Sequence, residues 1–214
     1  MIKISKKATY KTVSKHTETL LVEKKSKFIT NVMPVDTEEK ALEFLQEIKK
    51  KYSDATHNVY AYIIDENNIF RYSDDGEPGG TAGMPVLDTI RKEGLVDVIV
   101  VVTRYFGGTL LGTGGLVHAY GAGAKGGLLE SGIITRTLCN IVDFKVDYTL
   151  LGKVQYYIQT NNYILEDTIY DNEVTFKICS KIEDTEKLVV DLVDLTNGRV
   201  TYEISDEPKY IDVK

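Results

Sequence analysis

The sequence predicts an α+β protein of two domains, and three observations lead to this prediction. The chain has 214 residues, enough for one large domain or two small ones. Strand and helix patterns follow one another irregularly through its first two thirds. Its last third instead follows the order β-α-β-β-α-β, which is the split βαβ arrangement. We place the boundary near residues 137–143 and assign residues 1–140 and 141–214 to the two domains.

The first domain opens with two strands, Thr17–Glu23 and Lys27–Met33, joined at a lysine-rich turn. A helix is expected next, because Asp36 is positioned as a cap and Glu39 follows three residues later. Apolar residues then recur at helical spacing: they are Ala41, Leu42, Leu45, Ile48 and Tyr52.

A hairpin, a central strand and two further helices complete the first domain. Asn58–Ile64 and Ile69–Tyr72 alternate as strands across a short polar turn. Met84–Glu93 is predicted as a short helix, since Pro85 suits a first turn and Gly94 a helix end. The remaining elements are a central strand that is apolar on both faces, Val98–Val102, and a helix rich in glycine and alanine, Thr113–Ser131.

The second domain is predicted from regular apolar spacing. Four strands and two helices are expected, and Gly198 ends the second helix. The strands are Asp143–Tyr148, Ile164–Tyr170, Val174–Cys179 and Val200–Ile204. The first helix carries Leu151, Val154 and Ile158 on one face, and the second helix carries Leu188, Leu192 and Leu195 on one face.

Composition excludes several classes of protein. No apolar run approaches the roughly 20 residues that span a bilayer, and the N-terminus lacks the apolar stretch of a signal peptide. We therefore expect a cytoplasmic protein with no membrane association.

Cys139 and Cys179 form no CxxC pair, which argues against a disulfide framework or a zinc site and favours two buried thiols.

Two glycine-rich segments, Ser73–Gly83 and Thr103–Gly115, flank the central strand. The second runs from a strand end into a helix start, where free N–H groups and the helix dipole suit an anion. A plain tight turn is the alternative. No Walker-type loop is present, and the GxGxxG match at 121–126 lies inside a helix. The candidate ligand- or anion-binding residues are Arg104, Tyr105, Gly107, Gly108, Gly112, Thr113, Gly114 and Gly115.

The first segment gathers three acids, Asp74, Asp75 and Glu77. They could hold a hard cation or orient a water as base, and with His57 they are the candidate catalytic residues. The alternative is a solvated turn whose Asp side chains accept from local N–H groups, and spacing favours this alternative. We predict no metal site and no cofactor, because neither His57 nor His118 lies at ligand spacing to another histidine.

Charge is distributed unevenly along the chain. Residues 1–140 hold 18 Lys and Arg against 17 Asp and Glu, whereas residues 141–214 hold 8 against 15. Like charges repel, so any nucleic-acid contact is expected from the first domain, while the acidic second domain could dock a protein partner. The candidate nucleic-acid residues are Lys24, Lys25, Lys27, Arg71 and Arg104, with Tyr105 stacking on a base. For Arg104, an internal ion pair with one of the three acids is the alternative.

Several long blocks of the sequence resemble the IMPACT/YigZ family. They are Ala55–His57, Ser73–Pro78, Gly80–Gly83, Arg104–Gly108, Leu111–Val117 and Tyr148–Val154. The resemblance implies a first domain like domain 2 of ribosomal protein S5. It also implies a ferredoxin-like second domain similar to the last domain of elongation factor G. Larger eukaryotic members are linked to translational control through an extra RWD domain, which this chain lacks. Gly79 and Met84 depart from the serine and the basic residue of many relatives.

We therefore expect a binding protein, rather than an enzyme, that regulates translation through RNA or the ribosome. The alternative is a small-molecule phosphate-binding enzyme or hydrolase that uses the glycine-rich loop and the acids.

Overall fold

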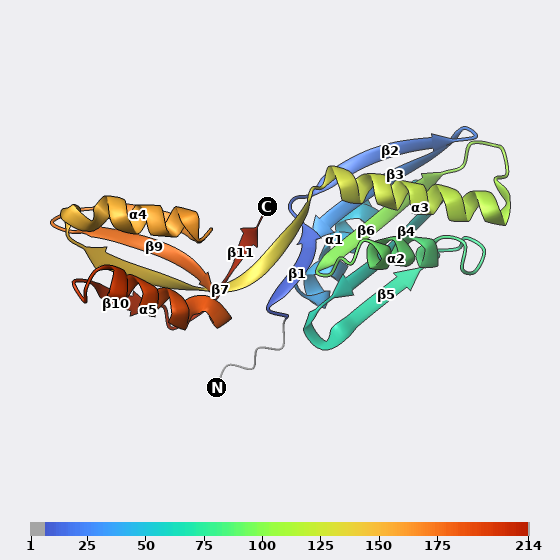
Figure 1. Cartoon of the computed structure of the whole chain (residues 1–214). Helices are drawn as coiled ribbons and strands as arrows, with labels where there is room; N and C mark the ends of the chain where they lie inside the picture. The colour runs from blue at the N-terminus through green and yellow to red at the C-terminus, as the bar shows by residue number, and fades with distance from the viewer. Residues whose placement is uncertain (1–6, 214) are drawn as a thin grey trace. The chain divides into compact units, whose positions relative to one another are not determined.

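The computed structural model describes residues 7–213 and divides into two compact units (Figure 1). The first unit ends at Thr135, and the second covers Arg136–Val213. The division falls inside a single strand, β7 (Ile133–Val146), which begins ten residues before the predicted strand start at Asp143. Residues 133–142 contain no proline or glycine that would end a strand, so β7 continues through the boundary.

The first unit is built on a five-stranded sheet in the order β2-β3-β6-β4-β5, with every neighbouring pair antiparallel. Its strands are β2 (Thr17–Glu23), β3 (Ser26–Pro34), β4 (His57–Ile64), β5 (Ile69–Ser73) and β6 (Val98–Tyr105); β1 (Thr9–Val13) precedes them, and the 3₁₀ turn η1 (Glu66–Asn68) joins β4 to β5. The predicted central strand is confirmed, because β6 lies in the middle of this sheet.

Helices cover both faces of this sheet (Figure 1). The side chains of β6 alternate between the faces, as a period of two requires. Val98, Val100 and Val102 pack with α2 (Gly83–Lys92) and α3 (Gly112–Glu130), whereas Ile99 and Val101 pack with α1 (Glu38–Lys51). The unit therefore has three layers, and β6 is buried on both faces.

The start of α1 differs from the prediction. Thr37, rather than Asp36, is the cap, because Thr37 Oγ1 accepts a hydrogen bond from the N–H of Lys40 at 3.3 Å. Asp36 instead pairs with Lys40 Nζ at 2.7 Å. Each residue can serve a helix start, and the extended backbone of Thr37 (φ −137°, ψ 157°) decides which one caps.

The second unit has the predicted element order β-α-β-β-α-β, followed by one further strand. After β7 come α4 (Leu151–Thr160), β8 (Ile164–Tyr170), β9 (Val174–Lys181), α5 (Thr185–Leu195), β10 (Thr201–Ile204) and β11 (Lys209–Val213), with 3₁₀ turns η2 (Tyr148–Leu150) and η3 (Ile182–Asp184). Neighbouring strands in the order β10-β7-β9-β8 are antiparallel. Phe144 and Phe176 pack against Val154 of α4 and Leu188 of α5 to form its core.

Cys139 and Cys179 belong to a small cluster separate from that core, in which Ile141 of β7 lies opposite Cys179 of β9 in the register. Both are unpaired and buried, which confirms the predicted buried thiols. Within residues 7–213, no helix combines the length and the apolarity needed to cross a membrane.

Candidate functional site

The first glycine-rich segment folds back to cap helix α2 through Asp74. Asp74 Oδ1 accepts hydrogen bonds from the N–H groups of Ala82 (3.1 Å) and Gly83 (2.8 Å), and Oδ2 accepts from Gly80 N–H (2.9 Å). The N-cap residue itself, Ala82, has no side chain that could do this. Asp74 thus satisfies N–H groups that a helix start leaves without partners.

Asp75 joins this turn to strand β4. Its Oδ2 accepts from the N–H of Asn58 at 2.7 Å, and its Oδ1 pairs with Lys49 Nζ at 3.1 Å. Its carbonyl oxygen lies 2.8 Å from Nδ1 of His57. Two of the three predicted acids are therefore engaged in local structure, and no group of metal-ligating side chains occurs in the part of the chain that the structure describes.

Glu77 differs, because it lies at the centre of a buried polar network. Its Oε1 accepts from Arg104 Nη1 at 2.6 Å and from the Tyr120 hydroxyl at 2.7 Å, and His57 Nε2 lies 3.8 Å away. The side chains of Glu77 and Arg104 are only 3% and 7% exposed. Burial, and then the hydrogen bond to Glu77, raise the pKa of Tyr120. The internal ion pair considered for Arg104 is therefore present, with Glu77 as its partner.

Aromatic rings enclose the Arg104 guanidinium. Its carbon lies 5.5 Å from the ring centre of Phe28 and 5.6 Å from that of Phe106. Such cation–π contacts strengthen when water is excluded. Ser26 Oγ is 3.4 Å from Arg104 Nη2 and also accepts from the N–H of Gly107 at 3.1 Å. Ser26 thereby links the β2–β3 turn to the second glycine-rich segment.

The second segment passes close to that turn and then starts α3. A Cβ on Gly107 would lie 2.1 Å from the carbonyl carbon of Lys25, so only glycine fits there. Gly112 has φ +76°, a left-handed conformation that glycine adopts without strain. No side chain caps α3, and no described residue accepts a hydrogen bond from the N–H of Gly112, Thr113 or Gly114.

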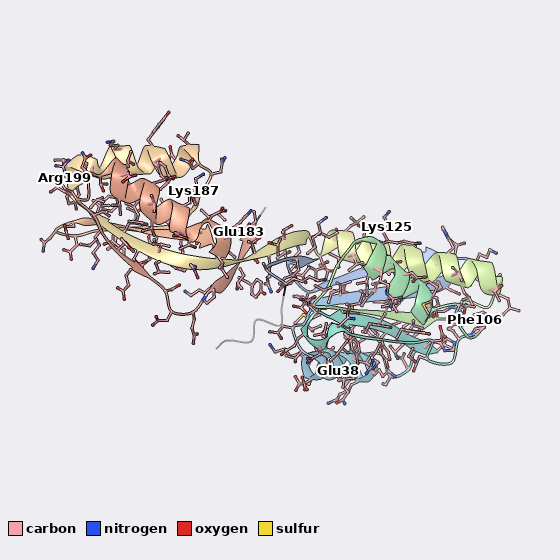
Figure 2. The ribbon with its side chains drawn as sticks, turned by 60° about the horizontal axis from the view of Figure 1, so that its bottom comes forward. Glu38, Phe106, Lys125, Glu183, Lys187 and Arg199 are labelled. Atoms are coloured by element: carbon pink, nitrogen blue, oxygen red, sulfur yellow. The ribbon has the colours of Figure 1, made fainter. Side chains whose placement is uncertain are left out.

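An open cleft of about 460 Å³ lies between the two segments. One end is polar, where Glu77, Arg104 and His57 meet, and most of the remaining surface is apolar. Figure 2 shows Phe106, which lines this cleft, at one end of the first unit, with Glu38 on α1 and Lys125 on α3 on opposite sides of the sheet. The lining residues are Thr56, His57, Glu77, Pro78, Arg104, Phe106, Leu110, Leu111, Gly112, Thr113 and Leu116.

The structure brings only some of the predicted anion-binding residues to this cleft. Arg104, Gly112 and Thr113 line it. Tyr105 follows Arg104 in strand β6 and therefore faces the other side of the sheet. There its hydroxyl donates to Asp54 Oδ1 at 2.7 Å, which raises the pKa of Tyr105 to about 12. The other predicted residues lie in the adjoining loop or the first turn of α3: Gly107, Gly108, Gly114 and Gly115.

The predicted nucleic-acid residues do not form one surface. Lys24, Lys25 and Lys27 lie together at the β2–β3 turn, and all three are exposed. Arg71 lies on the opposite edge strand, β5, with its Nε 3.8 Å from Glu38 Oε1 on α1. Arg104 is buried against Glu77.

Sequence reasoning missed several contributors to the site, among them Phe106, Tyr120 and Leu110. Tyr120 is the one large polar aromatic in a helix of small residues, and that contrast was a usable signal. Leu110 is 84% exposed at the mouth of the cleft, and nothing in its local pattern marks it.

These features define a class of protein: two α+β units, the first carrying a cleft between paired glycine-rich segments. Residues 24–128 match the Impact N-terminal domain, and residues 144–199 match a domain of unknown function, DUF1949. The chain belongs to the IMPACT/YigZ family, which confirms the resemblance found in its sequence.

Relatives in bacteria share most or half of this chain. The IMPACT family member YvyE of Bacillus subtilis is 42% identical over 89% of this chain and 88% of its own. The IMPACT family member YigZ of Escherichia coli is 43% identical over 50% of this chain and 54% of its own. A crystal structure of a hypothetical protein matches with a TM-score of 0.60 and 28% identity, covering 94% of this chain and all of that one.

Proposed function

We propose that this protein regulates translation by associating with RNA or the ribosome, and that the β2–β3 turn is the contact. The observation that carries this proposal is a fixed turn of exposed lysines. Lys24, Lys25 and Lys27 make no ion pair with any described residue, whereas Lys40, Lys49 and Lys51 are each paired. Unpaired ammonium groups can replace the counterions of a phosphate backbone.

The turn is held in shape before any partner arrives. Lys24 and Lys25 both have positive φ, +44° and +66°, as a two-residue hairpin turn of type I′ requires. Gly107 packs against the backbone of Lys25, and Ser26 bonds to the N–H of Gly107. A preformed turn loses little conformational freedom on binding, which favours association.

The finer fold likeness belongs to the same proposal. The strand order β10-β7-β9-β8, with α4 and α5 on one face, supports a ferredoxin-like second unit. We also propose that the first unit resembles domain 2 of ribosomal protein S5 and the second resembles the last domain of elongation factor G. Such likeness is consistent with a ribosomal partner, although fold alone does not assign one.

The test is binding of full-length protein to single-stranded RNA and to ribosomes over a series of salt concentrations. The variant Lys24→Asn/Lys25→Gly/Lys27→Gln removes three charges and keeps a sequence that favours the type I′ turn. Three lost phosphate contacts should reduce the slope of log affinity against log salt by about 2.

The matched control is Lys50→Gln/Lys92→Gln/Lys125→Gln, which removes three exposed lysines elsewhere in the first unit. It should bind as the wild type does. Equal losses in the two triple variants, or no binding by the wild type at low salt, would overturn the proposal.

A further inference from the structure

The polar end of the cleft presents two hydrogen-bond acceptors, on Glu77 and His57, beside Arg104, whose Nε–H is buried without a hydrogen-bond partner. Glu77 Oε1 is occupied by Arg104 and Tyr120, but no described residue donates to Glu77 Oε2. Only 3% of the Glu77 side chain is exposed. A carboxylate oxygen that receives no hydrogen bond from the protein accepts from water or from a ligand donor in the cleft.

His57 presents the second acceptor. A carbonyl oxygen can only accept, so the contact with Asp75 O fixes the proton of neutral His57 on Nδ1. That leaves Nε2 as an acceptor, 3.8 Å from Glu77 Oε1. A group with two N–H donors can bridge the imidazole and the carboxylate, which a single hydroxyl cannot do as well.

The start of α3 presents hydrogen-bond donors instead of acceptors. Gly112, Thr113 and Gly114 are exposed residues whose N–H groups have no described partner, at the positive end of a 19-residue helix. Gly112 and Thr113 line the same cleft as Glu77. This end therefore suits an anionic group.

Between the two polar groups lies an apolar surface with an aromatic ring. Phe106 is 48% exposed, and Leu110, Leu111 and Leu116 line the cleft beside it. The volume of about 460 Å³ lies within the roughly 300–1,000 Å³ typical of small-ligand sites. A flat, partly aromatic body fits this surface by stacking on Phe106, which Figure 2 shows at the end of the sheet.

We propose that the cleft binds a nucleoside monophosphate whose base carries an exocyclic amino group, as adenine and cytosine do. The amino group donates to Glu77 Oε2 and His57 Nε2, the base stacks on Phe106, and the phosphate accepts from the N–H groups that begin α3. The nucleotide is either free or the 5′-phosphorylated end of an RNA strand. In the second case the inference deepens the proposed function, because the lysine turn would hold the following phosphates.

Calorimetry on the full chain with paired nucleotides tests the amino group. Adenosine monophosphate should bind about tenfold more tightly than inosine monophosphate, and cytidine monophosphate about tenfold more tightly than uridine monophosphate. Within each pair the exocyclic amino group is replaced by a keto oxygen, and the neighbouring ring nitrogen changes from an acceptor to an N–H donor. Adenosine without phosphate should bind more weakly than its monophosphate. Equal affinities within both pairs, or no binding of any of these nucleotides, would overturn the proposal.

Two variants test the contacts at positions that the fold tolerates. Phe106→Ala should weaken binding by about fivefold or more, whereas Phe70→Ala, which removes another exposed phenylalanine, should not. Thr113→Asp places a carboxylate on the same N–H groups, which favours the helix but excludes the phosphate. It should weaken binding about tenfold, and Gln159→Glu, an exposed charge addition in the second unit, should leave it unchanged. Wild-type affinity in both Phe106→Ala and Thr113→Asp would contradict the assignment.

Competition distinguishes the two sources of the nucleotide. An RNA with a 5′-terminal adenosine monophosphate should compete with free nucleotide if the cleft takes strand ends, and the same RNA with a 5′-hydroxyl should compete less. If neither RNA competes while the nucleotide pairs still differ, the ligand is a free nucleotide. Mononucleotide binding does not require the lysine turn, so the triple lysine variant should retain it even if RNA binding is lost.

Discussion

Glu77 and Arg104 form a buried ion pair that joins the two glycine-rich segments, with Oε1 and Nη1 2.6 Å apart. The pair crosses from the turn before α2 to the end of the central strand. Tyr120 of α3 donates to the same carboxylate oxygen, so three elements of the first unit meet at one atom. Desolvation opposes such a pair, and its hydrogen bonds and aromatic cover offset that cost.

The first prediction concerns this pair. Arg104→Ala leaves Glu77 buried without its cation and should lower the free energy of unfolding by about 3–5 kcal/mol. Arg91→Ala is the control, because Arg91 and Asp88 form an exposed pair at 3.9 Å and its loss should cost less than about 1 kcal/mol. Urea titration measures both. Similar losses in the two variants would mean that the buried pair contributes no more than a surface pair.

The sequence predicted the elements better than it predicted the site. Strands with alternating or wholly apolar composition, such as Val174–Cys179 and Val98–Val102, were recovered because burial on one or two faces determines their pattern. The start of β7 was missed, because residues 133–142 carry no glycine or proline and no clear change in pattern.

For the site, local spacing identified the segments but not the pairing of their side chains. Asp74, Asp75 and Glu77 look alike in sequence, yet only Glu77 reaches the buried network. Which acid points inward depends on turns with φ +44° at Asp75 and +90° at Gly76, and these are fixed by tertiary contacts. Arg104 and Tyr105 were grouped as neighbours, although alternation along a strand places their side chains on opposite faces.

The second prediction tests the close approach at Gly107. Gly107→Ala would force its Cβ to 2.1 Å from the Lys25 backbone, so the turn or the loop must move. We expect a loss of about 1–3 kcal/mol in the free energy of unfolding. In Gly114→Ala the added Cβ meets no atom within 4 Å, and this variant should be neutral or slightly stabilising. Thermal denaturation of both variants measures the change in stability. An unchanged stability of Gly107→Ala would contradict the close packing of Gly107 against the Lys25 backbone.

The third prediction tests the capping role of Asp74. Asp74→Ala removes the acceptor for Ala82 and Gly83 and should cost about 0.5–2 kcal/mol, as loss of an N-cap does. Asp74→Asn keeps an acceptor oxygen and should recover most of this stability. Chemical denaturation of the three proteins measures the difference. An Asn variant as unstable as the Ala variant would show that charge, rather than the hydrogen bonds, matters at this position.

The last prediction is a pH dependence at the edge of the sheet. Glu18 Oε2 on β2 accepts from Lys51 Nζ and from the Tyr52 hydroxyl, each at 2.6 Å, at the end of α1. The hydrogen bond from Lys51, followed by that from Tyr52, lowers the pKa of Glu18 below its usual 4.5. A carboxyl with a lowered folded-state pKa contributes stability above its unfolded pKa and loses that contribution as the pH falls through the folded value.

Glu18→Gln should therefore be less stable than the wild type near neutral pH, by less than about 1 kcal/mol because the pair is half exposed. The difference should shrink as the pH is lowered below 4.5. Glu47→Gln, on the exposed side of α1, is the control and should show no such convergence. Urea titrations of the three proteins across this pH range measure the effect. A gap between wild type and Glu18→Gln that persists in acid would mean that the glutamate acts through packing rather than through its charge.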